Sequence, residues 1–272
     1  MNPIKNTIIS ILSLMSYFMI SCTEVVHIDL NSSNPVIVAE GYVEPSSAAS
    51  LRLTYTTDYY NMEAARVIED ARISVMDQGG NSEELNYQGN GVYTGEQLKG
   101  AIYSNYTLTI EVDGKTYSGS SSLLPAPDIA SISYAELLLG NPEMTELLGY
   151  TLNVAFDAIP DLDSYYALKI KKNGVYAANT YGLASTRINN EENYLYESHS
   201  FFVFPGDTID MAVYSIDFDA YTFYSQVNEG LSGNMILSPA PFNASSNLGE
   251  DILGYFMARS RIDTTFIVPT LP

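Results

Sequence analysis

Short stretches of alternating apolar and polar residues, separated by turn-forming residues, run through most of the chain. Leu51, Leu53 and Tyr55 alternate with polar residues, and the same period of two returns along Tyr103–Val112. This period is typical of strands with one buried face. We predict seven strands in the first half: Val36–Val43, Leu51–Thr56, Ala71–Met76, Glu84–Tyr87, Val92–Thr94, Tyr103–Val112 and Lys115–Gly119. Seven short strands with turns this frequent indicate a β-sandwich.

The turn residues between these strands support the same interpretation. Asp113-Gly114 forms a two-residue connection between two predicted strands, and Gln88–Gly91 reads as a hairpin connector. Such pairs favour tight turns between antiparallel strands. Thr57–Ile68 is the one long interruption, which we interpret as an ordinary loop at the edge of the sandwich, with a functional loop as the alternative.

Pro125-Ala126-Pro127 divides the pattern, because proline cannot occupy a central strand. A second series of strands follows: Ile129–Tyr134, Tyr150–Phe156, Tyr165–Lys171, Val175–Thr180, Phe201–Phe204, Thr208–Ser215, Ile252–Ala258 and Thr264–Val268. The Leu-rich stretch Glu136–Gly149 has the composition of a helical insert. Phe156–Ile170 resembles the second and third strands of a fibronectin type III-like sandwich, with Phe156 in place of the usual tryptophan.

One stretch near the end has the period of a helix. Phe218, Tyr221 and Tyr224 recur every three residues, with Asp217 placed to cap the start and Gly230 to end it. We predict one amphipathic helix over 217–229 that packs on a sheet. The predicted fold is therefore all-β: two Ig- or fibronectin type III-like β-sandwich domains, at 35–124 and 128–272, with this short helix in the second.

The first residues have a different character. Lys5 precedes an apolar run that ends at Ile20, and Ser21-Cys22 follows. A cation, an apolar region of about 13 residues and a small residue before the cleavage point make a secretory signal. The run is shorter than the roughly 20 residues of a membrane-spanning helix. We predict a signal peptide at 1–21 and a tether at 22–34.

Cys22 is the only cysteine, so it can form no disulfide within the chain. Met19-Ile20-Ser21-Cys22 resembles a bacterial lipobox, although Met19 replaces the commoner leucine. The resemblance implies that Cys22 is acylated and becomes the first residue of the mature protein. Two alternatives remain open: an ordinary secretory signal with an incidental cysteine, and an uncleaved anchor.

Composition adds a strong charge asymmetry. The chain has 12 basic and 32 acidic residues, for a net charge of −20. Such a surface repels nucleic acid, which we exclude as a partner. Tyrosine is abundant, with 22 residues, while tryptophan is absent. Tyrosine favours half-buried β-structure. Exposed tyrosines can also stack on sugar rings, but no cluster in the sequence singles out such a site.

The sequence contains no recognisable catalytic or metal-binding pattern. His27 and His199 lie far apart, and neither belongs to a nucleophilic motif, so we interpret both as surface or strand-face residues. Calcium takes oxygen ligands, and the acidic stretches lack its complete loop pattern. These stretches contain Asp157, Asp161, Asp163, Asp207, Asp210, Asp217 and Asp219. We predict no enzyme, no catalytic residue, no cofactor and no metal.

Nearly end to end, the chain resembles a family of Bacteroidetes outer-membrane lipoproteins, domain-of-unknown-function family 4249. Beside the lipobox, the likeness rests on a set of strand and turn segments: Val36–Val43, Ala71–Asp77, Gly91–Tyr93, Tyr106–Val112, Asp219–Tyr224, Ser238–Asn247 and Leu253–Phe256. The resemblance implies an outer-membrane lipoprotein associated with SusC-like, TonB-dependent transporters. It carries over no catalytic residues.

Together these features predict a non-enzymatic lipoprotein, held in the outer membrane by lipid on Cys22. It would act as an accessory or ligand-capture partner of a TonB-dependent nutrient transporter, with a glycan or peptide as ligand. Candidate contact regions are the long loops Asp58–Glu69, Tyr181–Tyr196 and Ser238–Asn247. Alternatives are a surface adhesion or spacer protein and, less favoured, a glycan-active enzyme. The sequence leaves open which face of the membrane the protein occupies.

Overall fold

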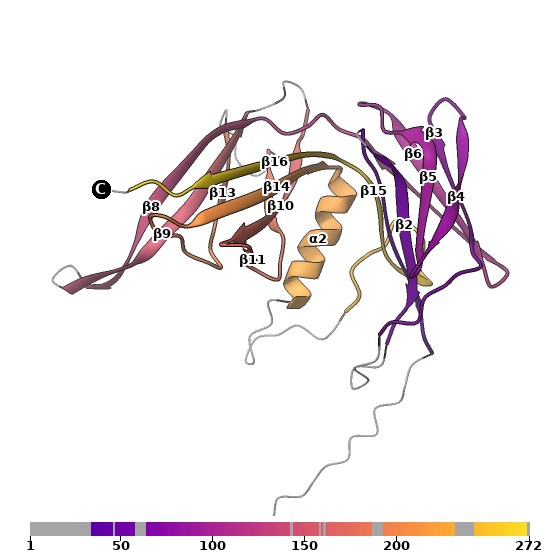
Figure 1. Ribbon diagram of the computed structural model, residues 1–272, viewed down its shortest axis with the longest axis horizontal. Helices are drawn as coiled ribbons and strands as arrows, with labels where there is room; N and C mark the ends of the chain where they lie inside the picture. The colour runs from indigo at the N-terminus through magenta and orange to yellow at the C-terminus, as the bar shows by residue number, and fades with distance from the viewer. Residues whose placement is uncertain are drawn as a thin grey trace, which may run out of the picture. The chain divides into compact units, whose positions relative to one another are not determined.

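The computed structural model describes residues 34–45, 47–57, 64–141, 144–157, 159, 162–186, 193–231 and 242–270 (Figure 1). The chain divides into two compact units, residues 1–34 and 35–272. Of the first unit only Asn34 is described, so the predicted signal peptide, Cys22 and His27 lie outside the described residues. The described part of the second unit consists mainly of strands and contains one helix, α2, which confirms the predicted all-β fold.

Seven strands from the first half lie in one eight-stranded sheet. They are β1 (Ile37–Val43), β2 (Ala48–Tyr55), β3 (Arg72–Asp77), β4 (Ser82–Gly89), β5 (Val92–Lys99), β6 (Asn105–Val112) and β7 (Lys115–Ser122). All seven are predicted from the sequence and confirmed. Positive φ angles at both residues of Asn90-Gly91 and Asp113-Gly114 show that these pairs form the expected tight turns.

The eighth strand, β15 (Ile252–Ala258), comes from the far end of the chain and lies outermost beside β1. β7 is at the opposite end of the strand order, yet it contacts β15, and the Ala258 N–H donates a hydrogen bond to the Ser121 hydroxyl of β7. The sheet therefore curls until its two ends meet. Its inward side chains, such as Leu51, Leu53 and Ile110, form a single buried core.

β15 runs parallel to β1, and this pairing depends on a glycine. Gly254 lies opposite Ala39, with a φ of +88°. A Cβ at Gly254 would overlap the carbonyl oxygen of Ala39. Only glycine combines this backbone conformation with so close an approach.

The second half forms two further sheets. The larger one contains β10 (Tyr165–Lys172), β11 (Val175–Tyr176), β12 (Gly182–Ser185), β14 (Thr208–Ile216) and β16 (Ser260–Ile267); the smaller contains β8 (Ile129–Asn141), β9 (Met144–Asp157) and β13 (Asn193–Glu197). One core unites them, since Phe156 of β9 packs on Tyr166 of β10 with ring centroids 4.6 Å apart. The two sheets thus pack face to face.

The helix α2 (Phe218–Leu231) covers the other face of the larger sheet. Its buried Ala220 and Tyr224 share a core cluster with Tyr165 and Ala167 of β10 and with Met257 of β15. Figure 1 shows α2 between β10 and β15, in agreement with these contacts. Asp217 caps the helix, accepting a hydrogen bond from the Ala220 N–H at 2.8 Å, as predicted. Among the described residues, no helix has the length and apolar character needed to span a bilayer.

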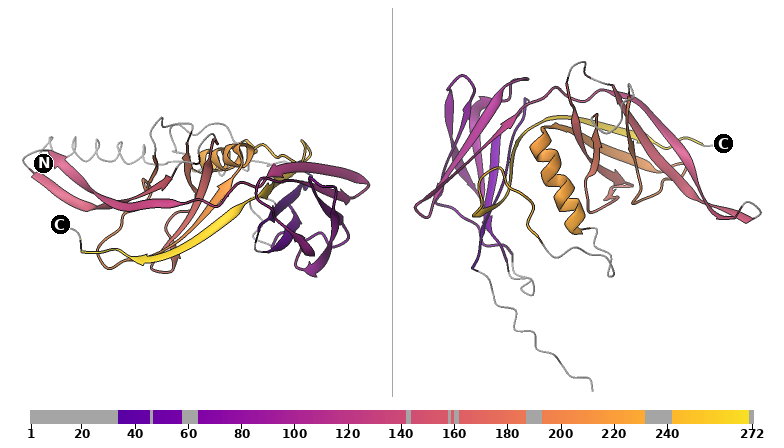
Figure 2. Two further views of the ribbon diagram at one scale, coloured as in Figure 1. Left: turned by 90° about the horizontal axis from the view of Figure 1, so that it is seen from above. Right: turned by 180° about the vertical axis from the view of Figure 1, so that it is seen from behind.

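Four predictions about secondary structure are wrong. Phe201–Phe204 is not a strand, because only Val203 forms an isolated bridge there, to Tyr150. Glu136–Gly149 is not helical: β8 and β9 pair along this stretch as a long hairpin, which Figure 2 shows from two sides. Pro142 lies in the middle of the stretch and cannot donate a helical hydrogen bond. Tyr181–Tyr196 is not a loop throughout, because β12 and β13 lie at its ends. Gly230 does not end the helix, which continues to Leu231.

The assignment of one strand to a sheet differs from the prediction. Ile252–Ala258 is predicted in the second series, and it is a strand, but it completes the first sheet. The next residues return to the larger sheet of the second half as β16. Arg259 lies at this crossing, where it forms an ion pair with Glu44 at 2.7 Å and stacks on Tyr42 and Tyr214.

Candidate functional site

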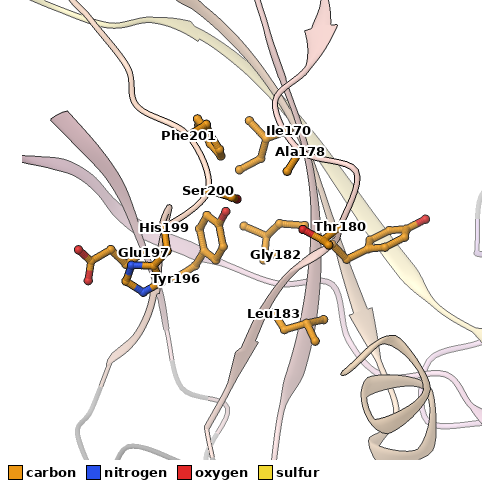
Figure 3. A pocket seen from close by; sticks show the side chains of 12 residues that line it. Ile170, Ala178, Thr180, Gly182, Leu183, Tyr196, Glu197, His199, Ser200 and Phe201 are labelled. Atoms are coloured by element: carbon orange, nitrogen blue, oxygen red, sulfur yellow. The ribbon is translucent and has the colours of Figure 1, made fainter. Parts of the chain in front are cut away.

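A half-open hollow of about 410 Å³ lies beside β10, β12 and the end of β13 (Figure 3). Its lining combines aliphatic, aromatic and polar side chains: Leu168, Ile170, Ala178, Thr180, Tyr181, Gly182, Leu183, Tyr196, Glu197, His199, Ser200 and Phe201. We call it the Tyr196 hollow. Such a mixture of apolar walls and a few polar groups is typical of small-ligand sites.

Tyr196 is the most enclosed polar side chain of this hollow, with 8% of its surface exposed. Its ring packs against Gly182, where a Cβ would overlap the ring, so the glycine makes room for it. Burial raises the pKa of the Tyr196 hydroxyl to about 12. The hydroxyl therefore stays protonated at neutral pH. A protonated phenol can donate a hydrogen bond to a bound molecule.

Glu197, His199 and Ser200 contain the residue types of a nucleophilic triad but not its geometry. Figure 3 shows Glu197 and His199 on one side of the Tyr196 ring and Thr180 on the other. His199 and Ser200 are exposed, which confirms the prediction that His199 is a surface residue. Within the described part of the chain no hydrogen bond joins His199 to Glu197 or Ser200, whereas a triad needs both.

Ser198, between these residues, fixes the backbone of the segment. It is fully buried, accepts a hydrogen bond from the Leu152 N–H at 2.9 Å and donates one to the Phe201 carbonyl at 3.1 Å. The segment is thereby attached to β9. Its alternate residues, Glu197 and His199, are left at the rim of the hollow.

A second hollow, of about 450 Å³, lies on the other face of the larger sheet, beyond the part that α2 covers. Alternate residues of β10 point to opposite faces. Tyr166, Leu168 and Ile170 enter the sandwich core, so Lys169 and Lys171 lie on the outer face. We call this surface the lysine–tyrosine face, defined by Lys169, Lys171, Tyr176, Tyr181, Tyr214 and Arg261.

The cations and rings of this face are interleaved. The Lys169 ammonium lies 4.1 Å from the ring centroid of Tyr181 and 5.5 Å from that of Tyr176. Lys171 lies 4.9 Å from the same Tyr176 ring. These are cation–π distances, so each ring is held beside a positive charge.

Lys169 differs from Arg261 of the same face. Arg261 forms an ion pair with Asp263 at 2.6 Å, whereas no carboxylate among the described residues lies within 4.0 Å of the Lys169 ammonium. Burial lowers the pKa of Lys169. Its charge has lost part of its hydration without gaining a carboxylate, which leaves it available to an anion.

Tyr181 lines both hollows and is held firmly in place by α2. The Asn228 side chain accepts a hydrogen bond from the Tyr181 N–H at 3.1 Å and donates one to its carbonyl at 2.7 Å. The Tyr181 ring packs on Tyr224 of the same helix, with centroids 4.2 Å apart. A ring fixed in this way is preorganised for contact with a ligand.

The predicted contact regions have different outcomes. Tyr181–Tyr196 contributes Tyr181, Gly182 and Tyr196 to the hollows. Of Asp58–Glu69, residues 58–63 lie outside the described residues, and of Ser238–Asn247, residues 238–241 do. Asn247 is structural, because its side chain bonds the Ser120 carbonyl and both backbone groups of Phe256, and so joins β7 to β15.

Sequence reasoning missed the lysine–tyrosine face. Its signal is the alternation of Lys169 and Lys171 with buried residues on β10, combined with Tyr214 and Arg261 on strands that only the topology brings together. Among the described residues, no group of three or more His, Cys, Asp or Glu side chains is placed to hold a metal ion.

Residues 23–264 match the family described as domain of unknown function DUF4249. The chain belongs to this family. The resemblance inferred from the strand and turn segments is thereby confirmed as to family. No curated protein matches the chain.

A crystal structure of a DUF4785 family protein from Legionella pneumophila is similar over 65% of this chain, with 12% identity and a TM-score of 0.23. The similar region spans about half, 52%, of that protein.

Proposed function

We propose that this chain is a lipid-anchored outer-membrane protein that captures a ligand, without catalysis, for a TonB-dependent transporter. The observation that carries the binding role is the position of Tyr181, fixed by α2 between the Tyr196 hollow and the lysine–tyrosine face. Both hollows are built on packed strands, which place binding groups more accurately than free loops do.

The anchor rests on the sequence. The predicted acylation of Cys22 places a tether of about 13 residues, 22–34, before the first described strand. A lipid anchor confines the hollows to a layer next to the membrane. The anchor thereby raises the local concentration of the captured ligand beside a transporter in the same membrane, so that transfer becomes effectively intramolecular.

Binding can be tested without knowing the ligand class. We would screen the full-length chain in detergent against glycan and peptide arrays, together with Tyr181→Ala and the control Tyr103→Ala. Tyr103 is 68% exposed and lies in the first half, away from both hollows. Ligand capture is supported if array signals of the native chain are lost in Tyr181→Ala and retained in Tyr103→Ala. An array without any signal would contradict it and favour a spacer protein.

The transporter partnership has its own test. Extraction of the native protein in mild detergent, followed by affinity purification, should recover a large β-barrel protein in stoichiometric amount. Recovery of the chain alone, under conditions that preserve other membrane complexes, would contradict the partnership while leaving ligand capture intact.

A further inference from the structure

The lysine–tyrosine face is a concentration of positive charge on a strongly acidic chain. Lys169 and Lys171 of β10 and Arg261 of β16 lie on one sheet face, with β14 between the two strands, and outnumber Asp210 and Asp263 of the same hollow. The whole chain, in contrast, has 12 basic and 32 acidic residues. Lys169 and Lys171 have ring faces, not carboxylates, as their nearest described partners. A surface of this kind attracts a negatively charged group that the rest of the protein repels.

The rings beside these cations offer a flat apolar surface. Tyr176 is 58% exposed although it lies within 6 Å of both lysines. A largely exposed aromatic ring beside a cation suits a ligand with an anionic substituent on a compact ring, because both parts make contact at once.

The floor of the hollow adds hydrogen-bond acceptors. Ala212 lies between Lys169 and Asp263 in the strand register, and its small side chain leaves the space above it open. Asp210 accepts a hydrogen bond from the Thr265 hydroxyl and, like Asp263, lines the hollow. Carboxylates accept hydrogen bonds from sugar hydroxyls, which an acidic peptide does not offer along its backbone.

We propose that the lysine–tyrosine face binds an acidic sugar of an oligosaccharide, with its carboxylate or sulfate at Lys169 and its ring on Tyr176. This inference rests on the proposed capture function and names its ligand class. The site combines an ammonium without a carboxylate partner among the described residues, an exposed ring and acceptors for hydroxyl groups. These residues lie on β10, β11, β14 and β16, and no sequence motif unites them.

The test compares four probes on the full-length chain in detergent by isothermal titration: oligogalacturonate, dextran sulfate, neutral dextran and poly-glutamate. We expect binding of oligogalacturonate or dextran sulfate, and the one that binds identifies carboxylate or sulfate as the recognised group. Neutral dextran should not bind. Lys169→Gln and Tyr176→Ala should each weaken binding at least about tenfold. Lys115→Gln, which removes an exposed lysine paired with Asp251 on the first half, should leave it unchanged.

The proposal is overturned if neither acidic saccharide binds, if poly-glutamate binds equally well, or if Lys169→Gln binds as tightly as the native chain. Its failure is distinguishable from that of the capture function. If a neutral glycan or a peptide binds the native chain but not Tyr181→Ala, the acidic-sugar proposal is refuted, whereas the capture function is still supported. Thermal unfolding of each variant, compared with that of the native chain, shows whether a loss of binding comes from the site or from the fold.

Discussion

The carboxylate of Asp217, at the start of α2, accepts a hydrogen bond from the hydroxyl of Ser121 on β7, 96 residues earlier in the chain. The same oxygen accepts the Ser122 N–H at 3.1 Å, and the other oxygen caps the helix. Ser121 in turn accepts the Ala258 N–H of β15. One side chain thus joins the helix that holds Tyr181 to the closing edge of the first sheet.

We expect Asp217→Ala to lower the free energy of unfolding by about 2–4 kcal/mol, because it removes a helix cap and leaves the Ser122 N–H without its partner. The matched control is Asp219→Ala, since Asp219 is an exposed carboxylate in the first turn of the same helix. It should cost less than about 1 kcal/mol. Urea unfolding measures both. Equal losses would show that the charge near the helix start matters and the bonds to β7 do not.

Asp217 and Asp207 should affect stability in opposite directions as the pH changes. Burial raises the pKa of Asp217 above its ordinary value of 3.8, although hydrogen bonds from Ser121 and two backbone N–H groups oppose it. Its contribution to stability is therefore fully present below about pH 4 and is lost as the pH rises through the folded-state pKa.

For Asp207, burial alone would raise the pKa, but bonds from Asn173 and the Phe204 N–H, together with Lys172, outweigh it and lower the pKa. Its contribution is present above the unfolded-state pKa and is lost as the pH falls. The stability of the native chain minus that of Asp217→Asn should therefore decrease from about pH 3 to pH 7, and the same difference for Asp207→Asn should increase. Two slopes of the same sign would contradict this assignment.

Gly254→Ala should destabilise the first sheet by about 2–4 kcal/mol or prevent folding. The added methyl group must displace the Ala39 carbonyl, and the alanine backbone must keep a positive φ. Gly174→Ala is the control. It also has a positive φ, of +81°, but no atom lies within 4 Å of its added Cβ. It should cost only the strain of the backbone, about 1 kcal/mol. A similar cost at both positions would show that the parallel pairing tolerates a side chain.

If the chain carries a lipid anchor, it should incorporate a fatty-acid label covalently. Cells that express the chain and take up an alkyne fatty acid should yield labelled protein, and Cys22→Ala should abolish the label, because acylation needs the thiol. The full-length variant should also remain in the signal-bearing form, visible as a mass difference. Label that persists in Cys22→Ala would refute the lipobox interpretation.

The sequence predicted those elements whose local pattern and tertiary environment agree. β2 and β6 each bury one face, so the alternation of Leu51 and Leu53, or of Leu108 and Ile110, is visible without the fold. The helix was recognised because Asp217 and its aromatic stripe follow local rules. The hairpin of β8 and β9 was not, since Leu137, Leu138 and Leu147 have no alternation that separates a strand from a helix.

The lysine–tyrosine face was hidden for a different reason. In β10, Tyr165 and Ala167 are buried under α2, while Tyr166 and Leu168 are buried in the sandwich. The first part of the strand is therefore apolar on both sides. Only at Lys169, beyond the reach of the helix, does the outer side become polar. Neither the contribution of Tyr214 and Arg261 nor the return of β15 to β1 can be derived without the strand pairings.

The return of β15 has a consequence for how the protein is made. A chain that leaves the ribosome with its amino terminus first exposes the outer edge of β1 until residues 252–258 have been synthesised. During that interval the edge is open to pairing with the wrong strand, including the same strand of another nascent copy. In a chain truncated before Ile252 the edge of β1 would stay unpaired permanently. We therefore expect early termination products to aggregate or be degraded, even though they contain β10 and β12, which line the Tyr196 hollow.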